Sequence, residues 1–350
     1  MSLPAPQGPY RVGAVEGRLV DTSRAAHIGS DRVGRELYLK IWYPGVPSGL
    51  EPELLWEEIR ADANVPRAFR HVLKAIRTRT SSRRDAPFDA SARHPFVVLY
   101  NHGLISFASE NTSLMEHLAS CGHIVVALRH VEQMAELQTL NRRDSAAKRK
   151  ADAEAARRLR IAAPEERARL AVEYYRQSVN TNLIVGERAR DTLLALDRLA
   201  NVLQRVPGSD AADFDCDAVH VVGFSVGGAV ATETAARDSR VKSVTNLDGG
   251  FYGSRASAPI GRPYLMMYST ANDGINDLLL PAHAVRRTPA NTTHLNYHDI
   301  AALLPVLRYA GLTGKANPRE VIALRNRTVE AFIRGADETA ASVTASSTAL

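Results

Sequence analysis

The sequence has little cysteine, no long apolar run and no export signal at its start. Only Cys121 and Cys216 occur among 350 residues, which predicts two free thiols and favours a reducing compartment. No window of about 18 uninterrupted apolar residues is present, so we expect no membrane-spanning helix. The first residues lack the basic-then-apolar order of a secretory signal, and we therefore expect a cytoplasmic location.

The common motifs of phosphate and metal binding are absent as well. The sequence contains no Gly-x-x-x-x-Gly-Lys-Ser/Thr, no Gly-x-Gly-x-x-Gly after the first strand, and no His-Glu-x-x-His or paired Cys-x-x-Cys. We therefore expect no cofactor and no metal site.

Surplus charge is confined to one segment. The chain has 44 Lys and Arg against 38 Asp and Glu, and residues 142–169 alone contain ten basic and five acidic residues. This segment is rich in Ala and has no aromatic residue, so it is interpreted as a solvated helical insertion and no nucleic-acid partner is expected. Peripheral contact with membrane headgroups or an anionic partner is the alternative, and such binding would weaken steeply with salt.

The apolar segments that are present alternate with helical ones. Five short apolar runs are typical of parallel strands buried on both faces: residues 96–100, 124–128, 219–222, 241–244 and 264–268. Helical spacing is found in residues 112–120, 182–204, 227–237, 299–309 and 318–334. Residues 10–20 and 35–43 are predicted to form an antiparallel edge, and residues 52–60 and 68–77 have a helical composition. This order predicts an α/β fold with a doubly wound, mostly parallel sheet.

The predicted organisation is a single domain over residues 1–335. Residues 131–180 are nearly all helix-forming and too long for a connection, which predicts a helical cap or lid at the C-terminal edge of the sheet. Residues 336–350 are small and polar, and they predict a disordered tail.

The clearest chemical motif is Gly223-Phe224-Ser225-Val226-Gly227-Gly228, which follows an apolar strand and opens an Ala-rich helix. A serine hydroxyl is a poor nucleophile, so it must stand on a sharp turn where a base can reach it. Glycines on both sides leave room for such a turn. The motif therefore predicts that Ser225 is a nucleophile.

A serine nucleophile also requires two backbone N–H donors for the oxyanion. The first expected donor is the amide of Val226, directly after the nucleophile. The second is expected from the loop after the strand at 96–100, where Leu104 follows His102 and Gly103. His102 is interpreted as a structural imidazole that holds this loop.

Chain order places the acid and the base after the serine, and several residues qualify. Asp248 follows the strand at 241–244, whereas Asp273 and Asp277 follow the strand at 264–268. His294 and His298 lie together before a predicted helix, and His283 lies earlier. The pattern alone leaves these choices open.

The chain resembles the platelet-activating factor acetylhydrolase (plasma-type) branch of the α/β-hydrolases, a group of serine esterases. The resemblance is carried by Gly8-Pro9-Tyr10, the run from Leu37 to Pro44, the run from Tyr100 to Leu104, the serine motif, Asn246-Leu247-Asp248-Gly249 and His294-Leu295-Asn296-Tyr297. It implies an α/β-hydrolase fold, with Asp248 as the acid and His294 as the base.

The sequence departs from the family pattern around the serine. Family members usually have His before the nucleophile and an aromatic residue after it, whereas this chain has Phe224 and Val226. Ile105 stands beside the oxyanion loop, near the position where a second glycine is common. Phe224 and Ile105, together with His130 at the end of the second parallel strand, are the predicted pocket residues, although a structural role is the favoured alternative for His130.

These features predict a cofactor-independent serine hydrolase that cleaves a small ester or lipid through an acyl-enzyme. The resemblance alone implies a short-acyl, phospholipid-like ester. The same triad could instead transfer the acyl group or open a lactone, as in a tailoring step of secondary metabolism. A ligand-binding protein without turnover and an adaptor that docks through its basic insertion are the alternatives from other classes. A burst of p-nitrophenyl acetate hydrolysis that is lost in His294→Ala would exclude the ligand-binding protein. An adaptor would lose its association but keep small-ester turnover when residues 140–170 are deleted.

Overall fold

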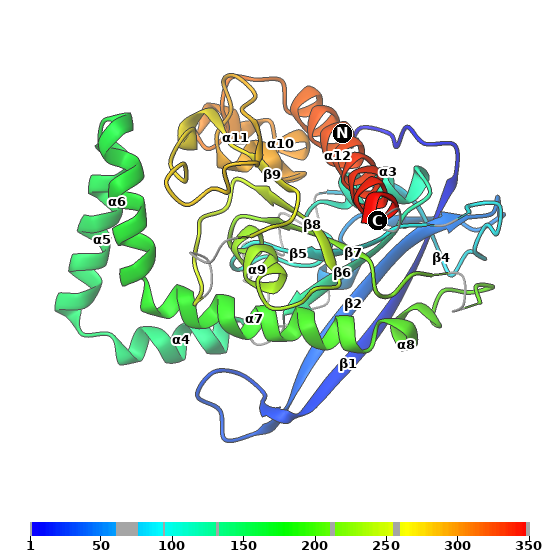
Figure 1. The fold of residues 1–350 in the computed structure, drawn as a ribbon, viewed down its shortest axis with the longest axis horizontal. Coiled ribbons are helices and arrows are strands. Elements are labelled where there is room, and N and C mark those ends of the chain that lie inside the picture. The colour runs from blue at the N-terminus through cyan, green and yellow to red at the C-terminus, as the bar shows by residue number, and fades with distance from the viewer. Residues whose placement is uncertain are drawn as a thin grey trace.

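The computed structural model describes residues 2–60, 76–93, 95–130, 133–210, 214–254 and 260–347. Within them a ten-stranded sheet has the order β10-β9-β8-β7-β5-β6-β2-β1-β4-β3 (Figure 1). The strands are β1 (Arg11–Ala25), β2 (Val33–Gly45), β3 (Pro52–Leu54), β4 (Arg79–Arg84), β5 (Val97–Asn101), β6 (Ile124–His130), β7 (Val219–Phe224), β8 (Val241–Leu247), β9 (Tyr264–Met267) and β10 (Val285–Arg287). The five predicted apolar strands are confirmed as β5 to β9, and these neighbours pair in parallel.

The helices alternate with these strands, as the sequence predicts. They are α1 (Glu57–Arg60), α3 (Thr112–Ser120), α4 (Gln133–Arg143), α5 (Ala146–Ile161), α6 (Pro164–Gln177), α7 (Val179–Asp197), α8 (Leu199–Leu203), α9 (Val226–Ala235), α10 (Ile300–Leu303), α11 (Val306–Tyr309) and α12 (Pro318–Ser347), with short 3₁₀ turns η2 (Thr270–Asn272) and η3 (His294–Tyr297). The predicted helix over 299–309 is divided into α10 and α11 at Pro305, which has no N–H to donate.

The central strands are buried on both faces because helices cover both sides of the sheet. Val97 and Leu99 of β5 pack in a core cluster with residues of α7, α8 and α9. Their neighbours Val98 and Tyr100 point to the other face and pack with residues of α3 and α12. Burying each such side chain contributes roughly 1.5–3 kcal/mol, which explains why these strands are continuously apolar.

The N-terminal strands differ from the prediction in one respect. β1 and β2 are antiparallel, and β2 also pairs antiparallel with β6, but they do not form the edge of the sheet. β4 pairs with β1, and β3 pairs with β4 beyond it. β4 was not predicted, because its sequence is polar. The strand is held instead by hydrogen bonds, since the amides of Ser81 and Ser82 donate to the buried carboxylate of Glu116 at 2.6 and 2.7 Å. Residues 52–60 form β3 and α1, and residues 68–75 of the second predicted helix lie outside the described residues.

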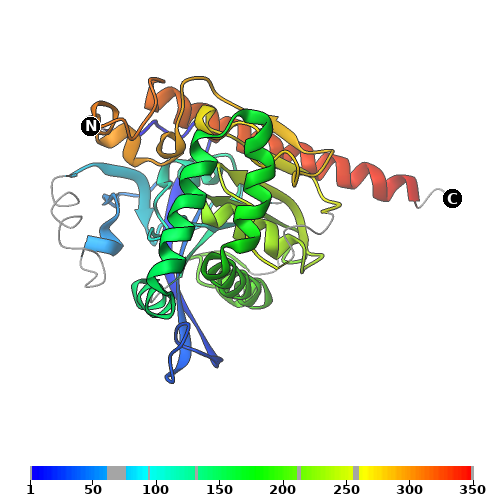
Figure 2. The same ribbon diagram turned by 90° about the vertical axis from the view of Figure 1, so that its left-hand side faces the viewer.

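The predicted cap corresponds to α4, α5 and α6, which lie between β6 and α7; residues 131 and 132 lie outside the described part of the chain. α5 and α6 pack on each other and stand out beside the C-terminal ends of the central strands (Figures 1 and 2). Ser145 caps α5 by accepting the amide of Lys148, and Glu165 and Glu166 lie in the first turn of α6, where the helix dipole favours acidic groups.

At the C-terminal end, α12 continues beyond residue 335 to Ser347, where the sequence predicts a disordered tail. The two differ because this stretch contains several Ala residues and no Pro or Gly, so its backbone can continue the helix. Residues 348–350 lie outside the described residues.

The two cysteines, Cys121 and Cys216, are both free thiols. Among the described residues, none of the helices combines the length and apolar character that a membrane crossing requires.

Candidate active site

Ser225 stands on a strained turn between β7 and α9. Its backbone has φ 57° and ψ −123°, in a region that residues other than Gly rarely adopt. The flanking glycines permit the close packing around it, since a Cβ at Gly223 would lie 1.9 Å from the carbonyl oxygen of Gly227. A Cβ at Gly227 would lie 2.0 Å from the carbonyl oxygen of Asn101. The turn thus presents the hydroxyl at the carboxyl end of the sheet.

Asp248 follows β8 and also has a left-handed backbone, with φ 54°. Its side chain is buried and accepts four hydrogen bonds. The amide of Ser269 donates at 2.6 Å, while the Ser269 hydroxyl, Asn272 Nδ2 and His294 Nδ1 donate at 2.9, 2.8 and 2.8 Å. These donors hold the carboxylate in one orientation toward the imidazole.

His294 is the first residue of η3. Thr293 and Asn296 form a capping box that fixes the start of this turn. The ring stacks on Phe224, with 4.7 Å between ring centroids, and its side chain is 38% exposed. Because Nδ1 is bound to Asp248, Nε2 is the nitrogen available for proton transfer.

Ser225, Asp248 and His294 line one cavity of about 290 Å³. Its other walls are mainly aromatic or polar and come partly from α5 and α6: Leu159, Tyr174, Tyr175, Val226, Gly249, Gly250, Tyr252, Tyr268, Asn272, Ile275 and Asn276. Tyr175 donates to Asn276 at 2.7 Å, and Asn276 donates to the carbonyl of Gly249 at 2.9 Å, so the insertion is tied to the loop after β8. The cavity can therefore accept a small acyl group next to the serine.

The two expected oxyanion donors belong to neighbouring backbone segments. Val226 directly follows the serine at the start of α9, and the side chain of Leu104 packs in the same apolar cluster as Val226. The loop of Leu104 passes close to the nucleophile, since a Cβ at Gly103 would lie 3.5 Å from Ser225 Cβ.

The alternative acids and bases lie in other settings. Asp273 and Asp277 both pair with Arg286, at 3.4 and 2.9 Å. His298 is buried, which lowers its pKa to about 3, and its Nδ1 accepts the amide of Ile300. His283 contacts the carbonyl oxygen of Arg262 at 2.7 Å. None of these four residues is among those that line the cavity.

The predicted pocket residues His130, Phe224 and Ile105 do not line the described cavity, which corrects that expectation. His130 is fully buried between Asp191 and Asn101, so its structural role prevails. Phe224 is covered by the ring of His294, because the residue before the nucleophile points into the core. Ile105 is 56% exposed with φ 54°, because the turn after Leu104 directs its side chain to the surface.

Several site residues escaped the sequence analysis. Ser269 and Asn272, which donate to Asp248, follow β9 in the chain. Their position just after a strand is the one feature of the sequence that could have indicated a role at the site. Tyr174, Tyr175 and Tyr252 wall the cavity from distant parts of the chain, so no local motif marks them.

The chain was compared with known proteins. A family model described as "Platelet-activating factor acetylhydrolase, isoform II" matches residues 1–341. A platelet-activating factor acetylhydrolase of Cavia porcellus is 23% identical over 298 residues, which cover 79% of this chain and 62% of that protein's length. The solved structure of a ferulic acid esterase from Streptomyces cinnamoneus superposes with a TM-score of 0.68 and 22% identity, covering 95% of this chain and 92% of that one. The latter likeness confirms the predicted fold.

Proposed function

Because the chain belongs to the platelet-activating factor acetylhydrolase, isoform II, family, we propose that it is a serine hydrolase that cleaves carboxylic esters through an acyl-enzyme. The observation that carries this proposal is the 2.8 Å hydrogen bond between His294 Nδ1 and Asp248 in the cavity that Ser225 also lines. A serine, an imidazole and a buried carboxylate around one cavity are the groups that acyl transfer requires.

In the proposed mechanism, Ser225 Oγ attacks the ester carbonyl while His294 Nε2 removes its proton. The resulting imidazolium is stabilised by Asp248, and the amides of Leu104 and Val226 hold the oxyanion. His294 then protonates the departing alkoxide. Water attacks the acyl-enzyme with His294 again as base, His294 returns that proton to Ser225 Oγ, and the carboxylic acid leaves.

We propose a short-acyl ester as the substrate class. The cavity of about 290 Å³ is small, and three tyrosines, Tyr174, Tyr175 and Tyr252, wall it beside the serine. The name of the Cavia porcellus relative makes a phospholipid acetyl ester the first compound to test, and that of the Streptomyces esterase makes a feruloyl ester the second.

Three assays test the proposed activity: covalent labelling, turnover of a model ester and a substrate panel. A fluorophosphonate probe should label the wild type and not Ser225→Ala, and p-nitrophenyl acetate turnover should fall in the same variant. A panel of esters from acetyl to octanoyl, with feruloyl and lactone substrates, should give the highest kcat/KM for the shortest acyl groups. Undiminished labelling of Ser225→Ala would refute the nucleophile, and products with an added alcohol or amine acceptor would reveal acyl transfer.

We also propose peripheral contact of α5 with anionic lipid. Part of its charge is paired, since Lys148 lies 2.8 Å from Asp152 and Arg157 lies 2.7 Å from Glu154. The segment over 142–169 still has five more basic than acidic residues. Sedimentation with phosphatidylserine vesicles should exceed that with phosphatidylcholine vesicles and should fall as salt rises. Equal binding to both would contradict this proposal.

A further inference from the structure

We propose that Arg188 is a positioning residue that orients the Leu104 amide toward the oxyanion by holding the carbonyl group of the preceding residue, Gly103. This inference rests on the proposed function, because it concerns the oxyanion donors of that mechanism. Arg188 belongs to α7, follows the helical insertion in the chain, and does not line the cavity.

The carbonyl oxygen of Gly103 accepts two buried hydrogen bonds. Arg188 Nη1 donates at 3.2 Å and also lies 3.4 Å from the carbonyl oxygen of His102. His102 Nδ1 donates to Gly103 at 2.7 Å. The other ring nitrogen of His102 accepts the amide of His130 at 3.3 Å, so one neutral tautomer satisfies both contacts.

The Gly103–Leu104 peptide unit transmits this orientation. A trans peptide is planar, and its C=O and N–H groups point in opposite directions. Holding the Gly103 carbonyl toward Arg188 therefore directs the Leu104 N–H to the opposite side. A donor must be aimed before the reaction, since reorientation during the charged step would cost much of its benefit.

The same loop is held from a second side. The amide of Gly103 donates to Glu110 Oε1 at 3.0 Å, and Glu110 also accepts the hydroxyl of Tyr100 at 2.6 Å. The loop therefore has its Gly103 amide and its Gly103 carbonyl fixed by different elements. Among these contacts, the one from Arg188 comes from α7.

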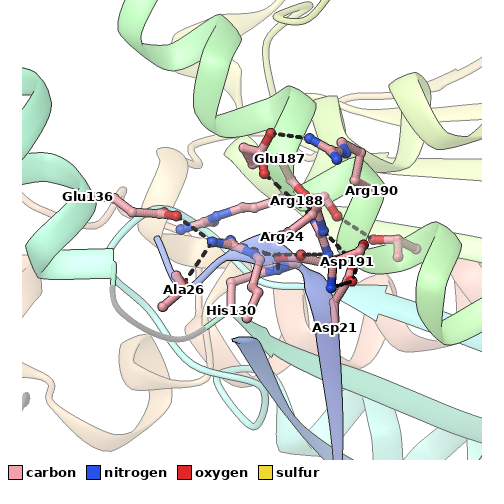
Figure 3. A network of polar contacts seen from close by, with 12 residues as sticks. Asp21, Arg24, Ala26, His130, Glu136, Glu187, Arg188, Arg190 and Asp191 are labelled. Atoms are coloured by element: carbon pink, nitrogen blue, oxygen red, sulfur yellow. Dashed lines mark hydrogen bonds and ion pairs between the residues drawn. The ribbon is translucent and has the colours of Figure 1, made fainter. Parts of the chain in front are cut away.

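Arg188 lies within a group of buried charges (Figure 3), which includes Glu136, Asp191 and Arg35. Asp191, one helical turn further along α7, accepts from Arg24 at 2.6 Å, from Arg35 at 2.7 and 2.9 Å and from His130 at 2.8 Å. Arg35 also pairs with Glu136 of α4 at 2.6 Å. Burial lowers the pKa of Arg188 to about 10, so the guanidinium remains charged at neutral pH.

The test compares Arg188→Met with Arg24→Met, a matched control. Arg24 is another buried arginine of the same network, but it bonds Asp21, Glu187 and Asp191 rather than the loop. The measurements are kcat and KM for p-nitrophenyl acetate, Ki for an aryl trifluoromethyl ketone that forms a tetrahedral adduct, and the urea midpoint of unfolding.

We expect kcat of Arg188→Met to fall about 10- to 100-fold, less than the loss from deleting an oxyanion donor, with KM changed less than threefold. Ki for the ketone should rise by the same factor, because the adduct depends on the same amide. Arg24→Met should lose a similar amount of stability but keep kcat and Ki within threefold. Equal kinetic losses in the two variants, or unchanged kcat and Ki in Arg188→Met, would overturn the proposal.

Two additional variants complete the test. If Arg188→Met does not fold, Arg188→Lys is used, which keeps the charge but ends one atom short of the Nη1 that contacts both carbonyls. A parallel change of about tenfold in kcat and Ki supports the proposal, and no change overturns it. In Ser225→Ala, surviving turnover would refute the proposed function and with it the oxyanion role of Leu104. Turnover lost in Ser225→Ala but unaltered in the Arg188 variants would refute this inference alone.

Discussion

Among the described residues, two aspartate–histidine pairs have the same Nδ1–Oδ2 distance and different surroundings. Asp248 and His294 are 2.8 Å apart at the cavity, and Asp191 and His130 are 2.8 Å apart in the interior. His294 has a side chain that is 38% exposed and a second nitrogen available to the cavity, whereas His130 is fully buried and its second nitrogen contacts Asn101 at 3.2 Å. A hydrogen-bonded aspartate and histidine therefore do not by themselves make a proton relay, because the relay also needs a nitrogen that can reach a substrate.

The carboxylates differ in the same way. Asp248 is held by Ser269, Asn272 and His294, and in the part of the chain that the structure describes no arginine or lysine is an ion-pair partner of this carboxylate. Burial acts to raise the pKa of Asp191, but hydrogen bonding from His130 and the charge of Arg35 outweigh it, and the pKa lies well below its usual range. Asp191 therefore neutralises arginines, and its contribution is to folding.

The largest expected effect separates the two pairs by activity. Asp248→Asn should reduce kcat about 10⁴-fold, since an amide cannot hold the required imidazole tautomer, and it should lower the urea midpoint less than Asp191→Asn does, because no buried arginine loses a carboxylate. Steady-state kinetics with p-nitrophenyl acetate measure the loss. A kcat within tenfold of wild type would show that Asp248 does not serve the base.

Asp191→Asn should have the opposite profile. The substitution leaves Arg24 and Arg35 with one buried carboxylate fewer, and we expect a loss of about 3–5 kcal/mol in the free energy of unfolding. Urea titration followed by circular dichroism measures it, and Asp248→Asn is the matched control. If the two variants unfold at the same urea concentration, Asp191 does not contribute more to folding than Asp248 does.

The stability of the protein should depend on pH through His130. Burial lowers the pKa of His130 from 6.5 to about 4, so the unfolded state takes up this proton first. The stability that a neutral His130 provides is fully present above about pH 6.5. It is lost as the pH falls toward 4, which lowers the free energy of unfolding by about 3 kcal/mol. Between pH 7 and 4, the free energy of unfolding of His130→Asn should therefore fall by about 3 kcal/mol less than that of the wild type. Other buried histidines are common to both proteins, so parallel curves would contradict the assignment.

The smallest expected effect concerns the ring beneath the catalytic imidazole. Phe224 stacks on His294 at 4.7 Å, and such a contact contributes about 0.5–1.5 kcal/mol. Phe224→Leu should therefore lower kcat/KM by up to tenfold with little change in labelling by the fluorophosphonate. A loss above 100-fold would mean that Phe224 does more than support the ring.

The strands of the fold could be predicted because their signals are local. A continuous apolar run such as 219–222 is typical of a strand buried on both faces, and this can be recognised without knowing the rest of the chain. β7 is found there. β4 could not be predicted, because the buried carboxylate of Glu116 satisfies its polar segment from 34 residues away. The same reason explains why the insertion was expected from composition but its tyrosines at the cavity were not.

At the site, the serine turn is encoded in six consecutive residues, and the glycines there are required by contacts of about 2 Å with neighbouring backbone. Asp248 and His294 were selected from several candidates by resemblance, and the structure brings these two together. Arg188 had no signal in the sequence, since its contact with Gly103 joins residues 85 positions apart.

By itself, the sequence determined the α/β order of elements, the family and the turn that carries the serine, because each depends on short-range sterics and on which residues must avoid water. Only the tertiary structure decided which aspartate meets which histidine, which imidazole keeps an accessible nitrogen and which walls close the cavity. Those outcomes depend on distances between residues far apart in the chain, and such distances are set by the packing of the whole sheet and its helices.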